Sequence, residues 1–229
     1  MLVVTLLPMA VPALVRADGQ VLLALQTTAA TDDPSADLAG ALLTALESPP
    51  GTTVPPGSAG QRLSRLQDLV DPSSEFDVSM HQSFDFWLDG TEAATAELRA
   101  ALDQANANAI PAARLSSVEA CYWCRIGDRD QLRWVMPYEE EQLLDALARL
   151  HARRQDDVGP GTRLLGTFRA FGRLVPVWDL APGTSADDVE KPASALASRL
   201  AAALEVTHPL SADERRARAG LTNRQVTVR

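Results

Sequence analysis

Two cysteines, Cys121 and Cys124, enclose a tyrosine and a tryptophan in a C-x-x-C spacing, which thiol–disulfide chemistry and zinc binding both use. A reactive pair has its first cysteine at a helix N-terminus, whereas this pair falls in a predicted strand. Residues three apart in a strand point to opposite faces, so the two sulfur atoms should diverge. Zinc needs about four ligands, and the sequence contains no second pair. The pattern favours two structural cysteines, with no metal site and no cofactor.

Residues 76–88 carry side chains suited to acid–base chemistry or to a binding surface. Apolar and polar residues alternate there with a period of two, which predicts a strand with one buried and one solvated face. His81, Asp85 and Trp87 fall on the solvated face. Residues four apart in a strand are about 13 Å apart, so His81 and Asp85 need a partner from a neighbouring strand for catalysis. An exposed tryptophan is typical of an interface, which makes Trp87 a candidate for partner binding.

Arginines in the second half of the chain are candidates for binding anions, because guanidinium groups pair well with phosphate and carboxylate. Arg125 and Arg133 lie in a predicted hairpin, and strand parity places Arg125 on the same face as Trp123. Several arginines on one open sheet face would form an anion-binding patch, and the alternative is a set of solvated charges. The next hairpin adds three more: Arg163, Arg169 and Arg173.

Two other features of this half favour a structural role. His151 falls at the edge of the apolar stripe of a predicted helix, which indicates packing. The glycines at 159 and 161 lack the residue order of a phosphate-binding loop. The chain also lacks the motifs of nucleophile-elbow hydrolases, P-loop NTPases and zinc proteases, which weakens an enzymatic interpretation.

The C-terminal tail is basic, whereas the rest of the chain is acidic. Arg215, Arg216 and Arg218 follow a capping-box pattern at Ser211, which predicts a short helix that ends near Gly220. These arginines could contact nucleic acid, an acidic protein or the acidic surface of the domain itself. The pattern favours a capping helix packed back on the domain.

Length and composition bound the answer further. The chain has 229 residues, of which 46% are hydrophobic, enough for a substantial core without disulfides or metal. Its net charge of −9 disfavours nucleic-acid binding by the domain as a whole. No stretch has the features of a signal peptide or a membrane span, so we expect a cytoplasmic protein.

The hydrophobic periodicity predicts an α+β fold, a mostly antiparallel sheet built from hairpin–helix units with helices packed on one face. The similarity between units leaves an internal duplication open. The predicted strands span residues 2–7, 20–27, 76–88, 120–126, 131–136, 163–170 and 173–180. The predicted helices span residues 34–46, 63–70, 91–107, 139–153 and 192–204. Three segments follow: an N-terminal α+β half at 1–110, a ββα-ββα half at 111–206 and the basic tail at 207–229.

Several stretches together resemble a domain family of unknown function from high-GC bacteria of actinobacterial type. The stretches are residues 7–10, 84–87, 117–125, 177–182 and 212–218. The resemblance covers nearly the whole chain, and its motifs belong to no known mechanism, so it implies no catalytic residue. Members of that family extend further upstream with a basic leader, which leaves open where the native chain begins.

Three functions remain as hypotheses. The first is a non-catalytic module that presents an open sheet face, with Trp87, Trp123 and the arginines, to a protein partner. The second is an enzyme or small-anion-binding protein whose site is assembled across strands from His81, Asp85 and the arginines. The third is association with nucleic acid through the tail. The sequence does not fix the oligomeric state.

Overall fold

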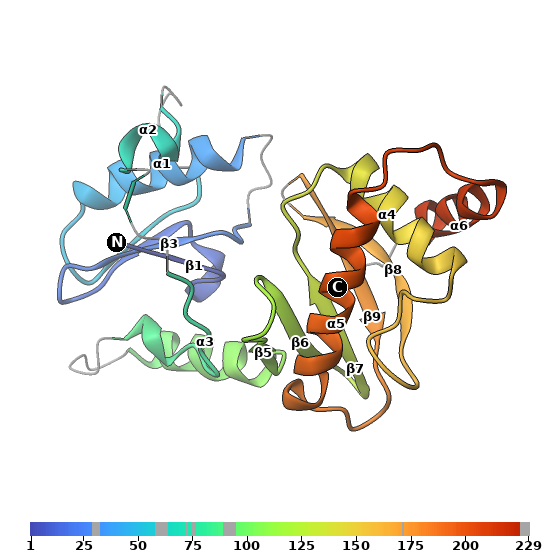
Figure 1. The fold of residues 1–229 in the computed structure, drawn as a ribbon. Coiled ribbons are helices and arrows are strands. Elements are labelled where there is room, and N and C mark those ends of the chain that lie inside the picture. The colour runs from blue at the N-terminus through green and yellow to red at the C-terminus, as the bar shows by residue number, and fades with distance from the viewer. Residues whose placement is uncertain are drawn as a thin grey trace. The chain divides into compact units, whose positions relative to one another are not determined.

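The computed structural model describes residues 1–28, 33–57, 64–71, 73–74, 77–88, 95–170 and 172–224. The chain divides into two compact units, Met1–Ala109 and Ile110–Arg229 (Figure 1). Each unit contains a mostly antiparallel open sheet with helices, so the predicted α+β class is confirmed. None of the helices in these ranges combines the length and apolar character needed to cross a membrane.

The first unit is built on a four-stranded sheet with the order β1-β3-β2-β4. Its strands are β1 (Leu2–Val4), β2 (Ala13–Val15), β3 (Val21–Ala24) and β4 (Thr52–Val54). β2 pairs antiparallel with β3 and with β4, whereas β1 pairs parallel with β3. Gly19, at φ +82°, makes the turn between β2 and β3, a conformation that favours glycine. Strands β2 and β4, of three residues each, were not predicted from the sequence.

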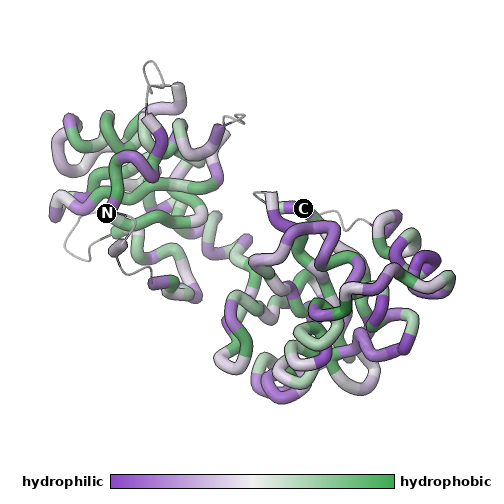
Figure 2. The backbone as a smooth tube through the Cα atoms, turned by 45° about the horizontal axis from the view of Figure 1, so that its top comes forward, coloured by the Kyte–Doolittle hydropathy of each residue, from purple (hydrophilic) through white to green (hydrophobic). Residues whose placement is uncertain are grey.

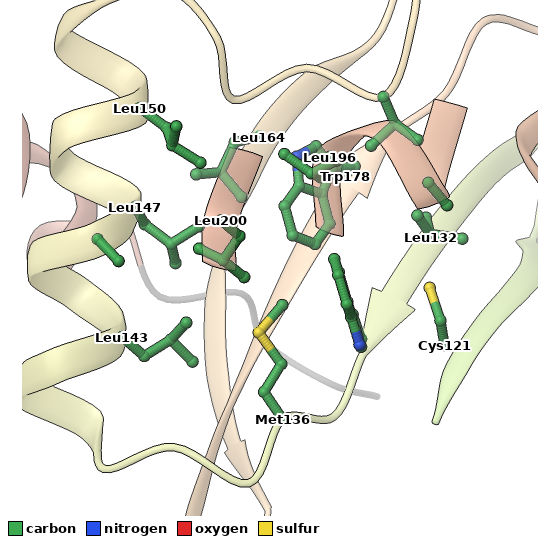
Figure 3. Packing of buried hydrophobic residues seen from close by; sticks show 14 of the residues in the cluster. Cys121, Leu132, Met136, Leu143, Leu147, Leu150, Leu164, Trp178, Leu196 and Leu200 are labelled. Atoms are coloured by element: carbon green, nitrogen blue, oxygen red, sulfur yellow. The ribbon is translucent and has the colours of Figure 1, made fainter. Parts of the chain in front are cut away.

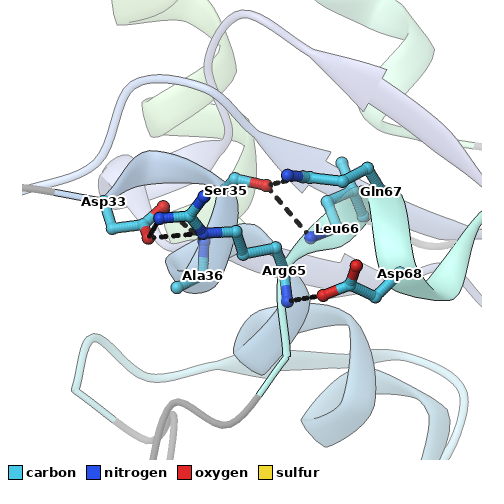
Figure 4. Close-up of polar contacts among 7 residues, drawn as sticks. All are labelled: Asp33, Ser35, Ala36, Arg65, Leu66, Gln67 and Asp68. Carbon is cyan, nitrogen blue, oxygen red and sulfur yellow. Dashed lines mark hydrogen bonds and ion pairs between the residues drawn. The ribbon is translucent and has the colours of Figure 1, made fainter.

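Helix α1 (Pro34–Leu46) has the bounds that the sequence predicts. The Asp33 carboxylate accepts a hydrogen bond from the Ala36 amide at 3.1 Å, which caps the helix. Asp33 also pairs with Arg65 at 2.9 Å, just before the short helix α2 (Leu66–Leu69), and the Ser35 hydroxyl accepts from the Leu66 amide (Figure 4). These contacts fasten α2 to the start of α1.

Both faces of this sheet are covered. Successive residues of β3 belong alternately to two clusters, because side chains alternate across a strand. One cluster packs under α1 and contains Ala13, Val15, Val21, Leu23, Ala41, Leu42, Ala45 and Val54. The other packs against η1 (Pro8–Ala10), η2 (Asp85–Trp87) and α3 (Ala96–Ala107), and its buried members are Leu7, Val11, Leu14, Leu22, Ala24 and Trp87.

The predicted strand at 76–88 is wrong over the described residues 77–88, which form an extended segment followed by η2. The alternation of residue types is not matched by burial, because Val78 and Met80 are both exposed. No strand of the sheet pairs with these residues, and the Phe84 amide instead donates to the Asn106 side chain of α3 at 2.7 Å. Phe76 lies outside the described residues.

The second unit is built on a five-stranded antiparallel sheet with the order β5-β6-β7-β9-β8. Its strands are β5 (Ala112–Arg114), β6 (Cys121–Ile126), β7 (Arg129–Trp134), β8 (Arg163–Ala170) and β9 (Arg173–Asp179). The predicted hairpins are confirmed at β6–β7 and β8–β9, and the edge strand β5 was missed. The hairpin that the first hairpin–helix unit requires between residues 2–7 and 20–27 is wrong, because β1 pairs parallel with β3.

Helices α4 (Glu140–Ala152) and α5 (Ala186–Leu204) cover one face of this sheet. Trp178, Leu132 and Leu147 are among the core residues between the layers (Figure 3). Figure 2 shows hydrophobic stretches of the backbone gathered in the interior of each unit. Helix α6 (Ala212–Asn223) packs on α4, so the basic tail is part of the second unit.

Two helix boundaries differ from the prediction. Helix α5 is capped by Ser185 and begins at Ala186, six residues before Pro192, so Pro192 lies inside the helix and not in its first turn. Helix α6 continues through Gly220 to Asn223, where Leu221 is buried in the core. Tertiary packing extends both helices past residues that usually end them.

Candidate functional site

The Trp87 side chain does not form the exposed surface that the sequence predicts. It is 2% exposed, its ring lies 5.1 Å from that of Phe84, and its indole N–H donates to the Leu6 carbonyl at 2.9 Å. The error follows from the wrong strand, because in η2 the indole turns into the core of the first unit. Trp87 is therefore a core residue.

His81 and Asp85 do not come together as an acid–base pair. The exposed His81 ring packs against Phe86 with a centroid distance of 4.8 Å. Asp85 accepts hydrogen bonds from the Ser83 hydroxyl at 2.7 Å and from the Asn106 amide at 3.3 Å. Within the described ranges no hydrogen bond joins His81 to Asp85, so these residues give no catalytic geometry.

Trp123 and Arg125 share one face of β6, as their parity predicts. This is the face that α4 and α5 cover, so the two residues do not lie on the open sheet face expected from the sequence. Arg125 donates to Asp130 at 2.7 Å and lies over the Trp123 ring. Asp130 is 2% exposed and also accepts from the Gly183 amide at 2.9 Å. The hydrogen bond from Arg125 lowers the pKa of Asp130, and burial works against it. Every charge here has a partner, so the group holds the hairpin to the loop before α5.

Arg133 lies on the opposite face of the same sheet. Its guanidinium lies 5.5 Å from the centre of the Phe168 ring, and it makes a long hydrogen bond of 3.4 Å to Gln131. The predicted set of arginines is therefore divided between two faces and forms no single patch.

The two cysteines are free and buried, and they also divide between the faces of the sheet. Cys121 belongs to the core under α4 and α5, and Cys124 does not. Burial raises the pKa of the Cys121 thiol to about 12, which leaves it protonated and unreactive at neutral pH. No group of three metal-ligating side chains occurs in the described part of the chain.

The tail arginines contact acidic and carbonyl groups of their own unit. Arg218 pairs with Glu141 and, at 2.7 Å, with Asp145, and both partners lie on α4. Arg216 pairs with Asp213, and Arg215 donates to the Leu210 carbonyl. Acidic partners therefore offset the charges of Arg216 and Arg218, whereas the partner of Arg215 is a backbone carbonyl.

A pocket of about 560 Å³ lies where the end of α4, the loop after it, the start of β8 and the end of α6 meet. Two leucines, Leu164 and Leu165, give it an apolar side. Its polar lining includes His151, Arg154, Asp156, Thr162, Arg163 and Arg224. Of the sequence-predicted binding residues, Arg163 lines it, whereas Trp87, His81, Asp85, Trp123, Arg125 and Arg133 do not.

The turn after α4 aims two of these side chains. Arg154 has φ +55°, a left-handed conformation that usually takes glycine. Its amide donates to the His151 carbonyl at 3.0 Å, and the Gln155 amide donates back to the Leu150 carbonyl at 2.9 Å. This Schellman turn reverses the chain, so that Asp156 returns to His151. Their side chains meet at 2.6 Å between Nδ1 and Oδ2.

Side chains of β9 and α5 hold the backbone of the loop after α4 through hydrogen bonds. The Trp178 indole donates to the Asp156 carbonyl at 2.6 Å. Arg199 of α5 donates to the carbonyls of Gln155 at 2.9 Å and Asp157 at 2.7 Å. A core tryptophan and a helix side chain therefore hold the loop backbone, which preorganises the His151–Asp156 pair.

Arg224 reaches the pocket from the end of α6. Its carbonyl accepts a hydrogen bond from the Thr167 amide of β8 at 3.1 Å. A side chain at Gly166 would place its Cβ only 2.2 Å from that carbonyl oxygen. Glycine at 166 is therefore needed for α6 to end against the strand.

Some charged side chains of the pocket have a partner inside the protein, and others, which we call available, have no ion-pair partner among the described residues. Arg163 pairs with Asp179 at 3.2 Å, Asp156 with His151, and Asp157 accepts from the Gly159 amide at 3.0 Å. Arg154 and Arg224 have no ion-pair partner within the described ranges, and both are exposed. Two available guanidinium groups beside a His–Asp pair can bind an anion and exchange a proton with it.

A family model for a family of unknown function (DUF5926) matches residues 1–229 of this chain. The chain belongs to this family. No curated protein and no solved structure matches it. The family membership agrees with the resemblance and leaves the site to be argued from its own geometry.

Sequence reasoning missed this pocket because it treated His151 as a packing residue. The turn after α4 gave no signal in the sequence. Its left-handed position is occupied by Arg154, whereas glycine or asparagine at that position is what usually identifies a helix end. Arg163 was assigned to a possible anion patch and Arg224 to the tail, and the fold brings both to the same pocket.

Proposed function

We propose that the second unit is a small-anion-binding module and that its site is the pocket between α4, β8 and α6. The observation that carries the proposal is the pair of arginines, Arg154 and Arg224, which line one pocket without an ion-pair partner in the described chain. Guanidinium groups bind phosphate and carboxylate oxygens through charge-assisted hydrogen bonds. The leucines beside them suit a ligand that carries an apolar part, and the volume is typical of small-molecule sites.

Backbone strain supports the same assignment. A non-glycine residue in the left-handed region costs on the order of 1 kcal/mol, and Arg154 occupies that position where glycine would be less strained. Strained backbone concentrates at ligand-binding sites, where the geometry serves the ligand. At Arg154 the strain accompanies a guanidinium that has no structural partner among the described residues.

The test is thermal unfolding of the whole chain with inorganic phosphate, citrate and acetate at constant ionic strength, since salt screens surface charges. A ligand at 100 times its Kd stabilises the folded protein by about 2.7 kcal/mol. Calorimetric titration with phosphate then gives Kd for three variants. We expect Arg154→Gln and Arg224→Gln each to weaken binding about 10-fold.

Arg129→Gln is the matched control, because it removes an exposed guanidinium of the same unit that does not line the pocket. It should leave Kd within about twofold of the wild-type value. Equal loss in all three variants would show nonspecific charge attraction. No stabilisation by any of the three anions would contradict the proposal.

Protein binding through a sheet face is the second proposal, and Trp87 no longer contributes to it. What supports it now is the face of the five-stranded sheet away from α4 and α5, where Arg133 lies over Phe168 beside the half-buried Tyr122. A pull-down from lysate with the wild type and with Arg133→Ala tests it. A protein that binds both equally well would not use this face.

A further inference from the structure

His151 has the geometry of a proton-transfer group. Its Nδ1 lies 2.6 Å from Asp156 Oδ2, so the carboxylate fixes the ring orientation and keeps the Nδ1 proton. The other ring nitrogen, Nε2, has no hydrogen-bond partner in the described part of the chain, and the residue lines the pocket. A neutral imidazole held in this tautomer presents Nε2 as a base.

The pocket contains no free hydroxyl or thiol nucleophile among its described lining residues. The Thr162 hydroxyl, which is the candidate, donates to the Gly159 carbonyl at 2.8 Å and accepts from the Val158 amide at 2.9 Å. A covalent acyl intermediate on a side-chain oxygen is therefore disfavoured. Attack by water, activated by His151, fits the groups that are present.

We propose that this pocket hydrolyses a phosphate monoester, with His151 as the general base, Asp156 as its positioning residue, and Arg154 and Arg224 as the phosphate ligands. The inference rests on the proposed anion-binding function and deepens it. The phosphoryl group suits the site because its transition state spreads charge over three oxygens, which the two arginines that line the pocket can stabilise.

The step balances without a cofactor. His151 Nε2 takes a proton from water while the water oxygen forms a bond to phosphorus. The bond from phosphorus to the ester oxygen breaks on the side opposite the attacking water, the departing alkoxide takes a proton from solvent, and Nε2 releases its proton to solvent. One phosphate monoester and one water give one alcohol and one inorganic phosphate, and His151 returns to its neutral form.

The experiment measures hydrolysis of p-nitrophenyl phosphate by the full chain, followed at the absorbance of p-nitrophenolate, with a nucleoside monophosphate and a sugar phosphate assayed in parallel by phosphate release. We expect His151→Gln to lower kcat by about 100-fold or more while KM changes less than threefold. Asp156→Asn should lower kcat by a smaller factor, because the ring can then adopt the wrong tautomer.

Chemical rescue separates proton transfer from a structural effect. Added imidazole should restore part of the rate to His151→Ala but not to Arg154→Gln, because only the first variant lacks the base. Arg129→Gln, purified in the same way, should retain the wild-type rate and so exclude a contaminating phosphatase as the source of the differences.

The outcomes distinguish this inference from the function beneath it. Phosphate binding in calorimetry with no hydrolysis of any of the three esters would overturn the catalytic inference and leave anion binding intact. A His151→Gln variant as active as the wild type would do the same. Absence of phosphate binding as well as hydrolysis would overturn both.

Discussion

Two polar groups of the second unit each combine a carboxylate with arginine side chains, and they differ in whether the arginine has an ion-pair partner inside the protein. Around Asp130, the carboxylate accepts hydrogen bonds from Arg125 and from the Gly183 amide. Around Asp156, the carboxylate bonds His151, while Arg154 and Arg224 keep no partner within the described ranges. Each group lies next to a tryptophan whose indole N–H donates to a backbone carbonyl, Trp123 to Thr184 and Trp178 to Asp156.

The difference shows how to separate structural charges from available ones. A buried carboxylate whose partners are all internal contributes to stability, and removing it leaves donors unsatisfied. An arginine that has no internal partner contributes little to stability. Its removal should therefore leave the free energy of unfolding nearly unchanged and weaken anion binding. The Asp130 group should therefore respond to mutation in unfolding experiments, and the pocket should respond in titrations.

The largest effect is expected at Asp130. Asp130→Ala leaves the Gly183 amide and the Arg125 guanidinium without their partner, and solvent reaches Arg125 because its side chain is 46% exposed. We expect a loss of about 2–3 kcal/mol in the free energy of unfolding, measured by urea denaturation. The phosphate Kd should stay the same. A loss below about 0.5 kcal/mol would show that the closed network does not stabilise the hairpin.

A smaller loss of stability is expected at Glu190, a second carboxylate whose hydrogen-bond partners lie within the protein. Its carboxylate accepts from the backbone amides of Ser116 at 2.7 Å and Ser117 at 2.8 Å. These hydrogen bonds, with those of the two hydroxyls, lower the pKa of Glu190 to about 2. Because the folded pKa lies below the unfolded value, the stabilisation is full above pH about 4.5 and is lost as the pH falls toward 2.

Glu190→Gln tests this linkage. The variant should lose on the order of 1 kcal/mol at pH 7, since the group is partly exposed and solvent screens it. Its stability should also fall less steeply than that of the wild type between pH 4.5 and 2. Parallel stability curves for the two proteins over that interval would show that the Glu190 carboxylate is not bound as the structure has it.

The sequence predicts elements well where local signals and packing agree. Helix α1 has its predicted bounds because the Asp33 cap, the proline at its first position and the apolar stripe all coincide. The segment before η2 failed because alternation describes residue types and not burial, and a strand also needs a neighbour for its backbone. The pocket could not be predicted, because it joins α4, β8 and α6 through tertiary contacts that no spacing in the sequence encodes.

The smallest change in stability, and the only gain, is expected from Arg154→Gly. Glycine adopts φ +55° without strain, so removing the side chain should stabilise the turn by up to about 1 kcal/mol, offset by the larger chain entropy of glycine in the unfolded state. The same change removes one of the two available guanidinium groups, so phosphate binding should weaken about 10-fold. Urea denaturation and calorimetric titration on one preparation measure both. A variant that is more stable and binds phosphate less tightly would show that the pocket keeps a strained arginine for its ligand. A variant that loses stability without losing affinity would place Arg154 among the structural charges, with Arg125.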